Sequence, residues 1–193
     1  MADINVEVIY FEKPGPQNTD KALDIAKKYA DQFGIKDIIL ASTTGMVAEK
    51  AVEVFTPREY NLVVITHSYY FLKKVRQEFP EEKMDALREK GLKFYAGTHA
   101  MAGIERNIRI EYKQWCFVDL MAKFIRDQFS QGTKVCMEIA SMAVDAGLIR
   151  DIEKDIICIG GTGRGADTVC LIKPMSTSEF DKLRVKAILA KPL

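Results

Sequence analysis

The chain has 193 residues, of which 48% are hydrophobic and 28% are charged, and its formal net charge is +1. These values fit one soluble globular domain, residues 1–193, and a near-neutral charge argues against a dedicated nucleic-acid binder. No apolar run reaches the ~18 residues of a membrane helix, and the first residues lack the pattern of a signal peptide. We therefore expect a cytoplasmic protein that binds neither nucleic acid nor membrane.

Short apolar strands alternate with helices along the chain. The first half predicts strands at 5–11, 37–41 and 62–66, helices at 19–33 and about 46–54, and a polar helix ending near Lys90. The second half predicts a strand at 92–96, one helix at 111–130, a helix at 134–146, and strands at 155–159, 168–173 and 184–190. The charged segment 73–90 and the loop at 97–110 are the least regular parts.

This alternation is typical of an α/β fold with a mostly parallel sheet. Because no helix separates the last strands, we expect the sheet to have a mixed or antiparallel edge. In such folds, ligands bind outside the carboxyl ends of the strands. The segments that follow the predicted strands are 11–19, 41–45, 66–70, 97–101 and 160–168.

The four cysteines are scattered, with no CxxC pair, and each lies in an apolar segment: Cys116, Cys136, Cys158 and Cys170. Buried, reduced thiols of a cytosolic protein are the favoured interpretation.

Three hydroxyls and a glycine, Ser42, Thr43, Thr44 and Gly45, stand between a buried strand and the helix at about 46–54. A helix N-terminus presents unpaired N–H groups and a partial positive charge, which favour a phosphate. Plain N-capping is the alternative, although one residue suffices for a cap and no capping box is completed. We expect an anion site, and we expect a carboxylate in place of Gly45 to repel phosphate while sparing the fold.

The stretch CIGGTGRGADTVCLIKP, residues 158–174, places four glycines around one arginine. It is neither a P-loop nor a dinucleotide fingerprint, because no Gly-Lys-Ser/Thr follows and the glycines open a β-branched run instead of a helix. A nest of N–H groups with a forked arginine would suit a phosphate, whereas a tight turn would use the glycines for positive φ. The expected ligand contacts are Gly161, Thr162, Gly163, Arg164 and Gly165.

The two histidines, His67 and His99, each follow a threonine just after a predicted strand. They are candidates to contact a ligand together with Thr66, while a hydrogen-bonded structural histidine or an exposed loop residue is the alternative for each. We expect no metal site, because neither histidine has a partner at ligand spacing. A triad with Ser68 and Asp167 is disfavoured, because no GxSxG elbow is present.

Further strand-exit candidates for ligand contact are Lys13, Gly15 and Thr168. The aromatic run 69–71 would stack on a planar ring, but such a cluster is more often core. Glu105 and Arg106 are interpreted as a pair on a solvated face.

The order of these motifs resembles the C-terminal α/β domain of pyruvate kinase, and more closely the stand-alone microbial proteins described as pyruvate kinase α/β-domain-like. The match covers nearly the whole chain, and the resemblance implies a three-layer α/β sandwich. The segments that carry it are FEKPG..NT (11–19), IILASTTGMVAEKAVE (38–53), VVITHS (63–68), GIERNI (103–108), VCMEIASMAVDAG (135–147) and GGTGRGADTVCLIKP (160–174).

In pyruvate kinase this domain carries an allosteric sugar-bisphosphate site. By resemblance, residues 42–45 would hold a phosphate beside the loop 161–165. The stand-alone relatives are of unassigned function and associated with flavin mononucleotide (FMN), which would put His67 and His99 beside the flavin ring. Tyr70 stands where relatives would carry a small residue, and it would stack on the ring or narrow the pocket. The 193 residues contain no catalytic barrel, so kinase activity is not implied.

The leading hypothesis is a protein that binds a phosphorylated planar ligand, most of all FMN. As an enzyme it would perform flavin redox chemistry, because the cofactor carries the reaction. The second hypothesis is a non-catalytic sensor of a sugar phosphate or nucleotide, and a hydrolase with a histidine base has little support. The sequence identifies no catalytic residue and leaves a homo-oligomer open.

Overall fold

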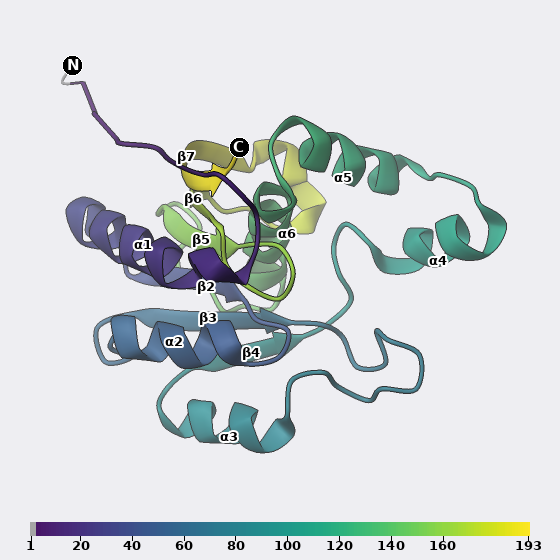
Figure 1. Cartoon of the computed structure of the whole chain (residues 1–193), viewed down its shortest axis with the longest axis horizontal. Coiled ribbons are helices and arrows are strands. Elements are labelled where there is room, and N and C mark those ends of the chain that lie inside the picture. The colour runs from purple at the N-terminus through teal and green to yellow at the C-terminus, as the bar shows by residue number, and fades with distance from the viewer. Residues whose placement is uncertain (1–2) are drawn as a thin grey trace.

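A computed structural model of the chain describes residues 3–193. At its centre lies one seven-stranded sheet with the strand order β1-β7-β6-β5-β2-β3-β4 (Figure 1). The strands are β1 (Ile9–Phe11), β2 (Asp37–Ala41), β3 (Asn61–Thr66), β4 (Lys93–Ala96), β5 (Ile156–Gly160), β6 (Thr168–Lys173) and β7 (Arg184–Pro192). Strand β6 is antiparallel to β5 and β7, and the other pairings are parallel. The expected α/β fold with a mostly parallel sheet and a mixed edge is confirmed.

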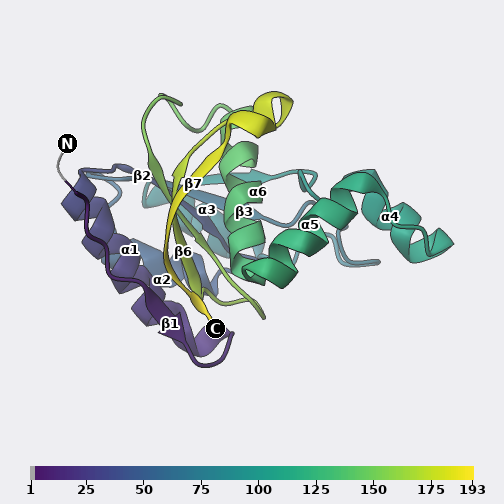
Figure 2. The ribbon, with the colours of Figure 1, turned by 90° about the horizontal axis from the view of Figure 1, so that it is seen from above.

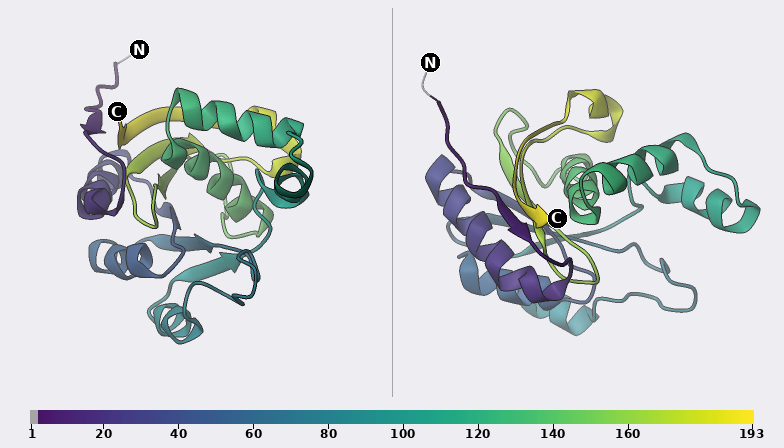
Figure 3. Two further views of the ribbon diagram at one scale, coloured as in Figure 1. Left: turned by 45° about the vertical axis from the view of Figure 1, so that its right-hand side comes forward. Right: turned by 45° about the horizontal axis from the view of Figure 1, so that its top comes forward.

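The helices cover both faces of this sheet. They are α1 (Thr19–Phe33), α2 (Met46–Val54), α3 (Glu81–Glu89), α4 (Gly103–Tyr112), α5 (Phe117–Gln128) and α6 (Gln131–Asp145), with short 3-10 helices η1 (Pro16–Asn18) and η2 (Thr177–Lys182). Figure 2 shows α1 and α2 on one side of the strands and α6 on the other. The strand β1 closes the edge of the sheet beside the last strand, where Phe11 pairs with Pro192 (Figure 3).

Each central strand is buried on both faces, which explains why its sequence is continuously apolar. In β2, Ile38 and Leu40 belong to the core that includes α1 and α2, while Ile39 belongs to the core that includes α6. Successive side chains of a strand point to opposite faces, so a run of β-branched residues supplies both cores at once. The result is a helix–sheet–helix sandwich.

The sequence predicts one helix over 111–130, but the structure has two, α4 and α5. Helix α4 begins inside the segment that was expected to be an irregular loop, and it ends before Lys113, which has a left-handed backbone with φ of 57°. The prediction is wrong because apolar residues recur at helical spacing across the break, and this periodicity does not show where the backbone turns.

Helices α4 and α5 extend away from the sheet beyond α6 (Figures 2 and 3). Helix α5 packs on α6 through Ala122, which is buried, whereas α4 has no buried residue. Asp119 joins the two helices: its carboxylate lies 3.2 Å from Arg109 Nε, and its backbone N–H donates to Glu105 at 3.0 Å. We call residues 103–128 the α4–α5 arm.

All four cysteines are free thiols. Cys136, Cys158 and Cys170 are buried as expected, but Cys116 is partly exposed because it lies between α4 and α5, outside the core. Burial raises the pKa of the Cys136 and Cys158 thiols well above their ordinary value, which makes both unreactive.

Within residues 3–193, none of the helices combines the length and the apolar character that crossing a bilayer requires.

Candidate functional site

A pocket of about 440 Å³ lies at the carboxyl ends of β2, β3, β4 and β5. This is the position at which α/β sheets bind ligands, and the volume falls within the range of small-molecule sites. Helices α4, α5 and α6 supply the rest of its wall. The segments that follow four different strands therefore meet helices that come later in the chain.

Nine of the residues singled out by the sequence line this pocket: Thr43, Thr66, His67, His99, Gly161, Thr162, Gly163, Arg164 and Gly165. Six others do not line it: Lys13, Gly15, Ser42, Thr44, Gly45 and Thr168. The structure thus brings together the strand-exit threonines, both histidines and the glycine-rich loop.

Two residues before α2 have structural roles. Ser42 is buried, and its hydroxyl accepts a hydrogen bond from the Ala48 N–H at 3.3 Å, as a helix cap does. Gly45 has φ of 102°, and a Cβ there would lie 3.1 Å from the Phe79 ring. The expectation that a carboxylate at Gly45 would spare the fold is therefore wrong, because both the backbone and the space oppose a side chain. Thr43 is the residue of this turn that reaches the pocket.

Two glycines of the loop after β5 allow close contact between backbones. A Cβ on Gly165 would lie 2.2 Å from Pro16 Cα, and one on Gly161 would lie 2.2 Å from the Gly165 carbonyl oxygen. Gly163 has φ of 61°, and a Cβ there would lie 3.8 Å from Pro16 Cδ, which is an ordinary contact. The loop therefore packs against η1 and against itself. This close packing of the chain is sufficient to explain why the loop contains glycines.

Asp167 fixes the base of this loop. Its buried carboxylate accepts one hydrogen bond from the Gly15 N–H and one from the Thr168 hydroxyl, each at 2.9 Å. Gly15 and Thr168, two residues predicted to contact the ligand, are in this way tied to Asp167 behind the pocket.

One wall of the pocket is aromatic. The His67 and His99 rings lie 5.0 Å apart, and the Phe71 ring lies 4.2 Å from the first and 4.8 Å from the second. Glu78 links this wall to the glycine-rich loop, because it contacts His67 Nδ1 at 2.6 Å and accepts a hydrogen bond from Arg164 at 3.1 Å. Arg164 therefore lines the pocket with part of its charge already balanced.

Tyr70, next to this wall, is exposed and does not line the pocket. Neither of the roles expected from the resemblance, stacking on a ring or narrowing the pocket, matches this position. Of the aromatic run 69–71, Phe71 is the residue that reaches the site.

His99 is held in its neutral form. Burial lowers its pKa from 6.5 to about 4, against the attraction of Glu138 and with help from the positive charges of Lys134 and Arg106. A neutral imidazole can donate one hydrogen bond and accept another. At neutral pH, His99 therefore offers a polar, uncharged edge to the pocket.

A buried ion pair on α6 forms the deepest part of the site. Lys134 Nζ lies 2.6 Å from Glu138, and the two side chains are only 3% and 4% exposed. Burial lowers the pKa of Lys134, while Glu138 opposes this shift. The other oxygen of Glu138 accepts a hydrogen bond from the Met101 N–H at 2.8 Å.

The pocket carries an excess of positive charge. Five cationic side chains line it (Arg106, Arg109, Arg126, Lys134 and Arg164), against three carboxylates (Glu78, Asp119 and Glu138). Arg106 lies over the Phe71 ring at 4.6 Å, and Arg126 donates to Gln131 at 2.7 Å. Among residues 3–193, neither of these two arginines has a carboxylate within ion-pair distance.

Two buried oxygens on the pocket wall have no hydrogen-bond partner in the described part of the chain, Thr66 Oγ1 and Asp119 Oδ2. A buried polar atom without a partner costs free energy, so such atoms are rare in folded proteins. Both atoms belong to residues that line the pocket, but neither atom is itself exposed to it.

Sequence reasoning missed most of the charged residues of the pocket. Arg106 was expected to pair with Glu105, but Glu105 accepts from the Asp119 backbone and Arg106 turns to Phe71. The i, i+4 spacing of Lys134 and Glu138 was a local signal for an ion pair. For Arg126 the sequence contains no signal, because its neighbours in the pocket come from distant segments.

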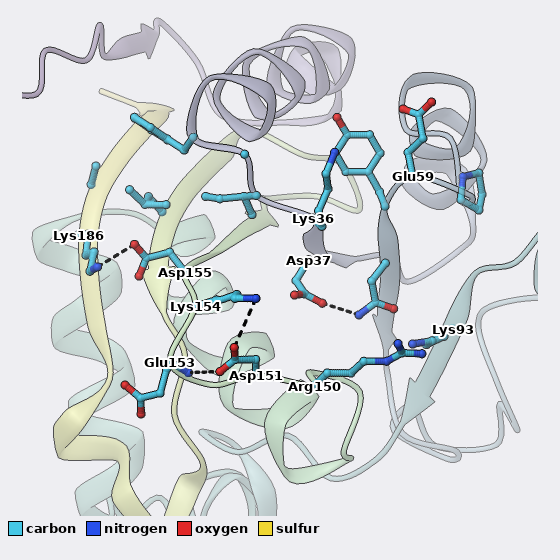
Figure 4. A pocket seen from close by; sticks show the side chains of 18 of the residues that line it. Lys36, Asp37, Glu59, Lys93, Arg150, Asp151, Glu153, Lys154, Asp155 and Lys186 are labelled. Atoms are coloured by element: carbon cyan, nitrogen blue, oxygen red, sulfur yellow. Dashed lines mark hydrogen bonds and ion pairs between the residues drawn. The ribbon is translucent and has the colours of Figure 1, made fainter.

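A larger hollow, of about 1190 Å³, lies at the opposite, amino ends of the strands (Figure 4). Side chains of both signs line it and pair with one another, as Lys186 does with Asp155 at 2.7 Å and Lys154 with Asp151 at 3.6 Å. Six cationic and five acidic side chains line it, so its charges are closer to balance by number than those of the carboxyl-end pocket. Four of the cations nevertheless have no carboxylate within ion-pair distance among the described residues: Lys36, Arg58, Lys93 and Arg150.

The carboxyl-end pocket therefore combines an excess of cations with an aromatic wall. This set of groups suits a ligand with an anionic part and a flat part. No protein-family model matches the sequence.

Replacing Gly165 by alanine should destabilise the fold by about 3 kcal/mol or more, because a Cβ would collide with the Pro16 backbone. Gly163→Ala is the matched control in the same loop, with an expected cost of about 1 kcal/mol from its left-handed backbone alone. Urea unfolding of both variants measures the difference. Equal losses would contradict the close packing of this loop on η1.

Protonation of His99 should make stability depend on pH. Its pKa is about 4 when folded and 6.5 when unfolded, so between these values the unfolded chain binds the proton more readily. The stabilisation is complete above 6.5 and is lost as the pH falls toward 4. Between about pH 7.5 and about pH 5, the wild type should lose about 2 kcal/mol more free energy of unfolding than His99→Asn. Parallel losses in urea titrations of the two proteins would exclude a neutral, buried His99.

Proposed function

We propose that this chain binds a phosphorylated small molecule with a planar ring in the carboxyl-end pocket, and that FMN is the foremost candidate. The observation that carries the proposal is the presence of Arg106 and Arg126 in this pocket without a carboxylate partner in the described residues. Cations that line a pocket without a protein counterion favour an anionic ligand, and arginine is suited to phosphate by its fork of donors.

The phosphate is assigned to the cationic part of the pocket. Arg106 and Arg126 come from the α4–α5 arm, and Arg164 comes from the glycine-rich loop. The Thr43 hydroxyl lines the same pocket just before the N-terminus of α2. A helix N-terminus adds a partial positive charge, so these groups favour an anion together.

The planar ring is assigned to the aromatic wall. Phe71 and His99 are stacked on each other with 15° between their ring planes, and with His67 they form an aromatic wall beside which a planar ring would lie. His99 is neutral near pH 7, so it suits the polar edge of an isoalloxazine. These residues fit a flavin in chemical character.

When bound, a flavin would supply redox chemistry, and the chain would bind and orient it. His67 and His99 lie beside the ring position, where they would hold hydrogen bonds at its edge. Arg106, which lies over the Phe71 ring, would offset negative charge on the bound flavin. The arrangement assigns no substrate.

A second candidate is a non-catalytic sensor of a sugar bisphosphate. It is favoured by the spread of the cations, because Arg106 and Arg126 lack a carboxylate partner in the described residues and Arg164 adds positive charge from a third segment, which suits more than one phosphate. The two candidates differ in whether an aromatic ring contributes to binding.

Titration of the purified chain with FMN, riboflavin and fructose bisphosphate tests the proposal. We expect FMN to bind at least about tenfold more tightly than riboflavin, because charge-assisted hydrogen bonds to phosphate contribute about 1.5 kcal/mol or more. Arg126→Gln should weaken FMN binding by about tenfold and leave riboflavin binding unchanged. Arg88→Gln is the matched control, since Arg88 is exposed on α3 and paired with Asp85 outside the pocket.

Three results would count against FMN. They are equal affinity for FMN and riboflavin, equal effects of the two arginine variants, and a colourless protein whose melting temperature FMN does not raise. A higher melting temperature with fructose bisphosphate alone would select the sensor. Mass spectrometry of small molecules that co-purify with the protein gives an independent answer.

A further inference from the structure

The α4–α5 arm exposes a set of large apolar side chains. Ile104 is 81% exposed and Phe117 is 77% exposed, although both are residue types that folding normally buries. The members of this set, which we call the arm surface, are Ile104, Tyr112, Trp115, Phe117, Leu120 and Phe124. Scattered apolar residues on a surface need no explanation, but a concentration on one projecting segment does.

The spacing of these residues follows the helices. Phe117, Leu120 and Phe124 recur at i, i+3 and i+7, so they form one stripe on α5. Ala122 lies on another face of the same helix and is buried. Ile104 and Tyr112 stand two turns apart on α4, which buries none of its residues. Helix α5 is therefore apolar on two faces, as is typical of a helix with packing partners on both sides.

Helix α4 buries none of its residues, so little apolar packing within the described chain supports it. It has only ten residues, and an isolated helix of that length is marginal in water. Its contacts with α5 include the Arg109–Asp119 ion pair and the hydrogen bond that Glu105 accepts from the Asp119 N–H, and both of these are polar. Figures 2 and 3 show it at the far end of the arm, away from the sheet.

We propose that the arm surface is a homodimer interface, in which the arms of two copies of this chain pack against each other. The proposal is independent of the ligand. An arm that projects from the body can lie along the same arm of a second copy, and a two-fold axis makes one surface self-complementary.

The exposed area fits a dimer. With about 200 Å² for a large side chain, the exposed fractions of the arm surface correspond to about 760 Å² on one copy. A stable interface buries about 800 Å² per partner, including its polar rim. The enrichment in Phe, Tyr and Trp is also typical of interface cores.

The net charge of the arm favours a second copy of the chain over a membrane or a nucleic acid as the partner. Residues 103–128 contain five cationic and four acidic side chains, which is close to balance. A helix that lies on an anionic membrane carries many Lys and Arg residues on its polar face, and a nucleic-acid surface needs a strong basic excess. A nearly neutral, apolar surface matches a copy of itself.

Sedimentation of the purified full chain without ligand tests the interface. We expect a dimer at micromolar concentration, and we expect Ile104→Asp/Phe117→Asp to raise the dimer dissociation constant by at least about a hundredfold. Ile4→Asp is the matched control, because Ile4 is 76% exposed but lies outside the arm. Far-UV circular dichroism checks that the body of the variant remains folded.

A wild type that stays monomeric at all concentrations would overturn the proposal, and so would a dimer that the double substitution leaves intact. If Ile4→Asp raised the dimer dissociation constant as much as the double substitution does, the interface would lie outside the arm surface. A monomer that pellets with phosphatidylcholine vesicles would replace the second copy by a lipid surface. Loss of FMN binding has no bearing on these outcomes, since no ligand is present.

Discussion

Lys134 and Glu138 lie one turn apart on α6, 2.6 Å from each other, and both are almost completely buried. Removing two charges from water is costly, and such a pair persists only where further hydrogen bonds complete it. Here the Met101 N–H donates to Glu138 just before α4 begins, and His99 Nδ1 lies 3.9 Å from the same carboxylate. The pair therefore ties the connection between β4 and α4 to the central helix. The pocket and the start of the arm both depend on this connection.

Two segments that suggest a phosphate site in the sequence are largely occupied with holding the chain together. The Ser42 hydroxyl accepts a hydrogen bond from the Ala48 N–H in the first turn of α2, and Gly161 and Gly165 permit close backbone approach. The glycines alone are therefore weak evidence for a bound ligand. The case for an anion rests on Arg106 and Arg126, whose charges no described carboxylate balances at ion-pair distance. The local motifs predict where the pocket lies. The charges that line the pocket depend on contacts between distant segments of the chain.

The elements that the sequence predicts best are those with strong local signals. The helix expected at 19–33 is α1 with the same bounds, because a regular apolar stripe ends at Gly34, which takes the left-handed conformation. The strands at 37–41 and 168–173 also have the predicted bounds, since each is a short run of residues buried on both faces. The sequence predicts one helix where the arm has two. The apolar pattern continues past Lys113, where the backbone leaves the helical conformation.

The pocket and the arm surface meet in one segment. Arg106, Arg109 and Arg126 supply three of the five pocket cations, and all three belong to the arm. The positions of these three side chains in the pocket depend on how α4 and α5 pack. Arg109 and Asp119, which join the two helices, both line the pocket, so the contact that shapes the arm is also part of the site. Packing of the arm surface against a second copy would restrict the movement of α4 and α5, and it would thereby fix the positions of Arg106, Arg109 and Arg126 in the pocket wall.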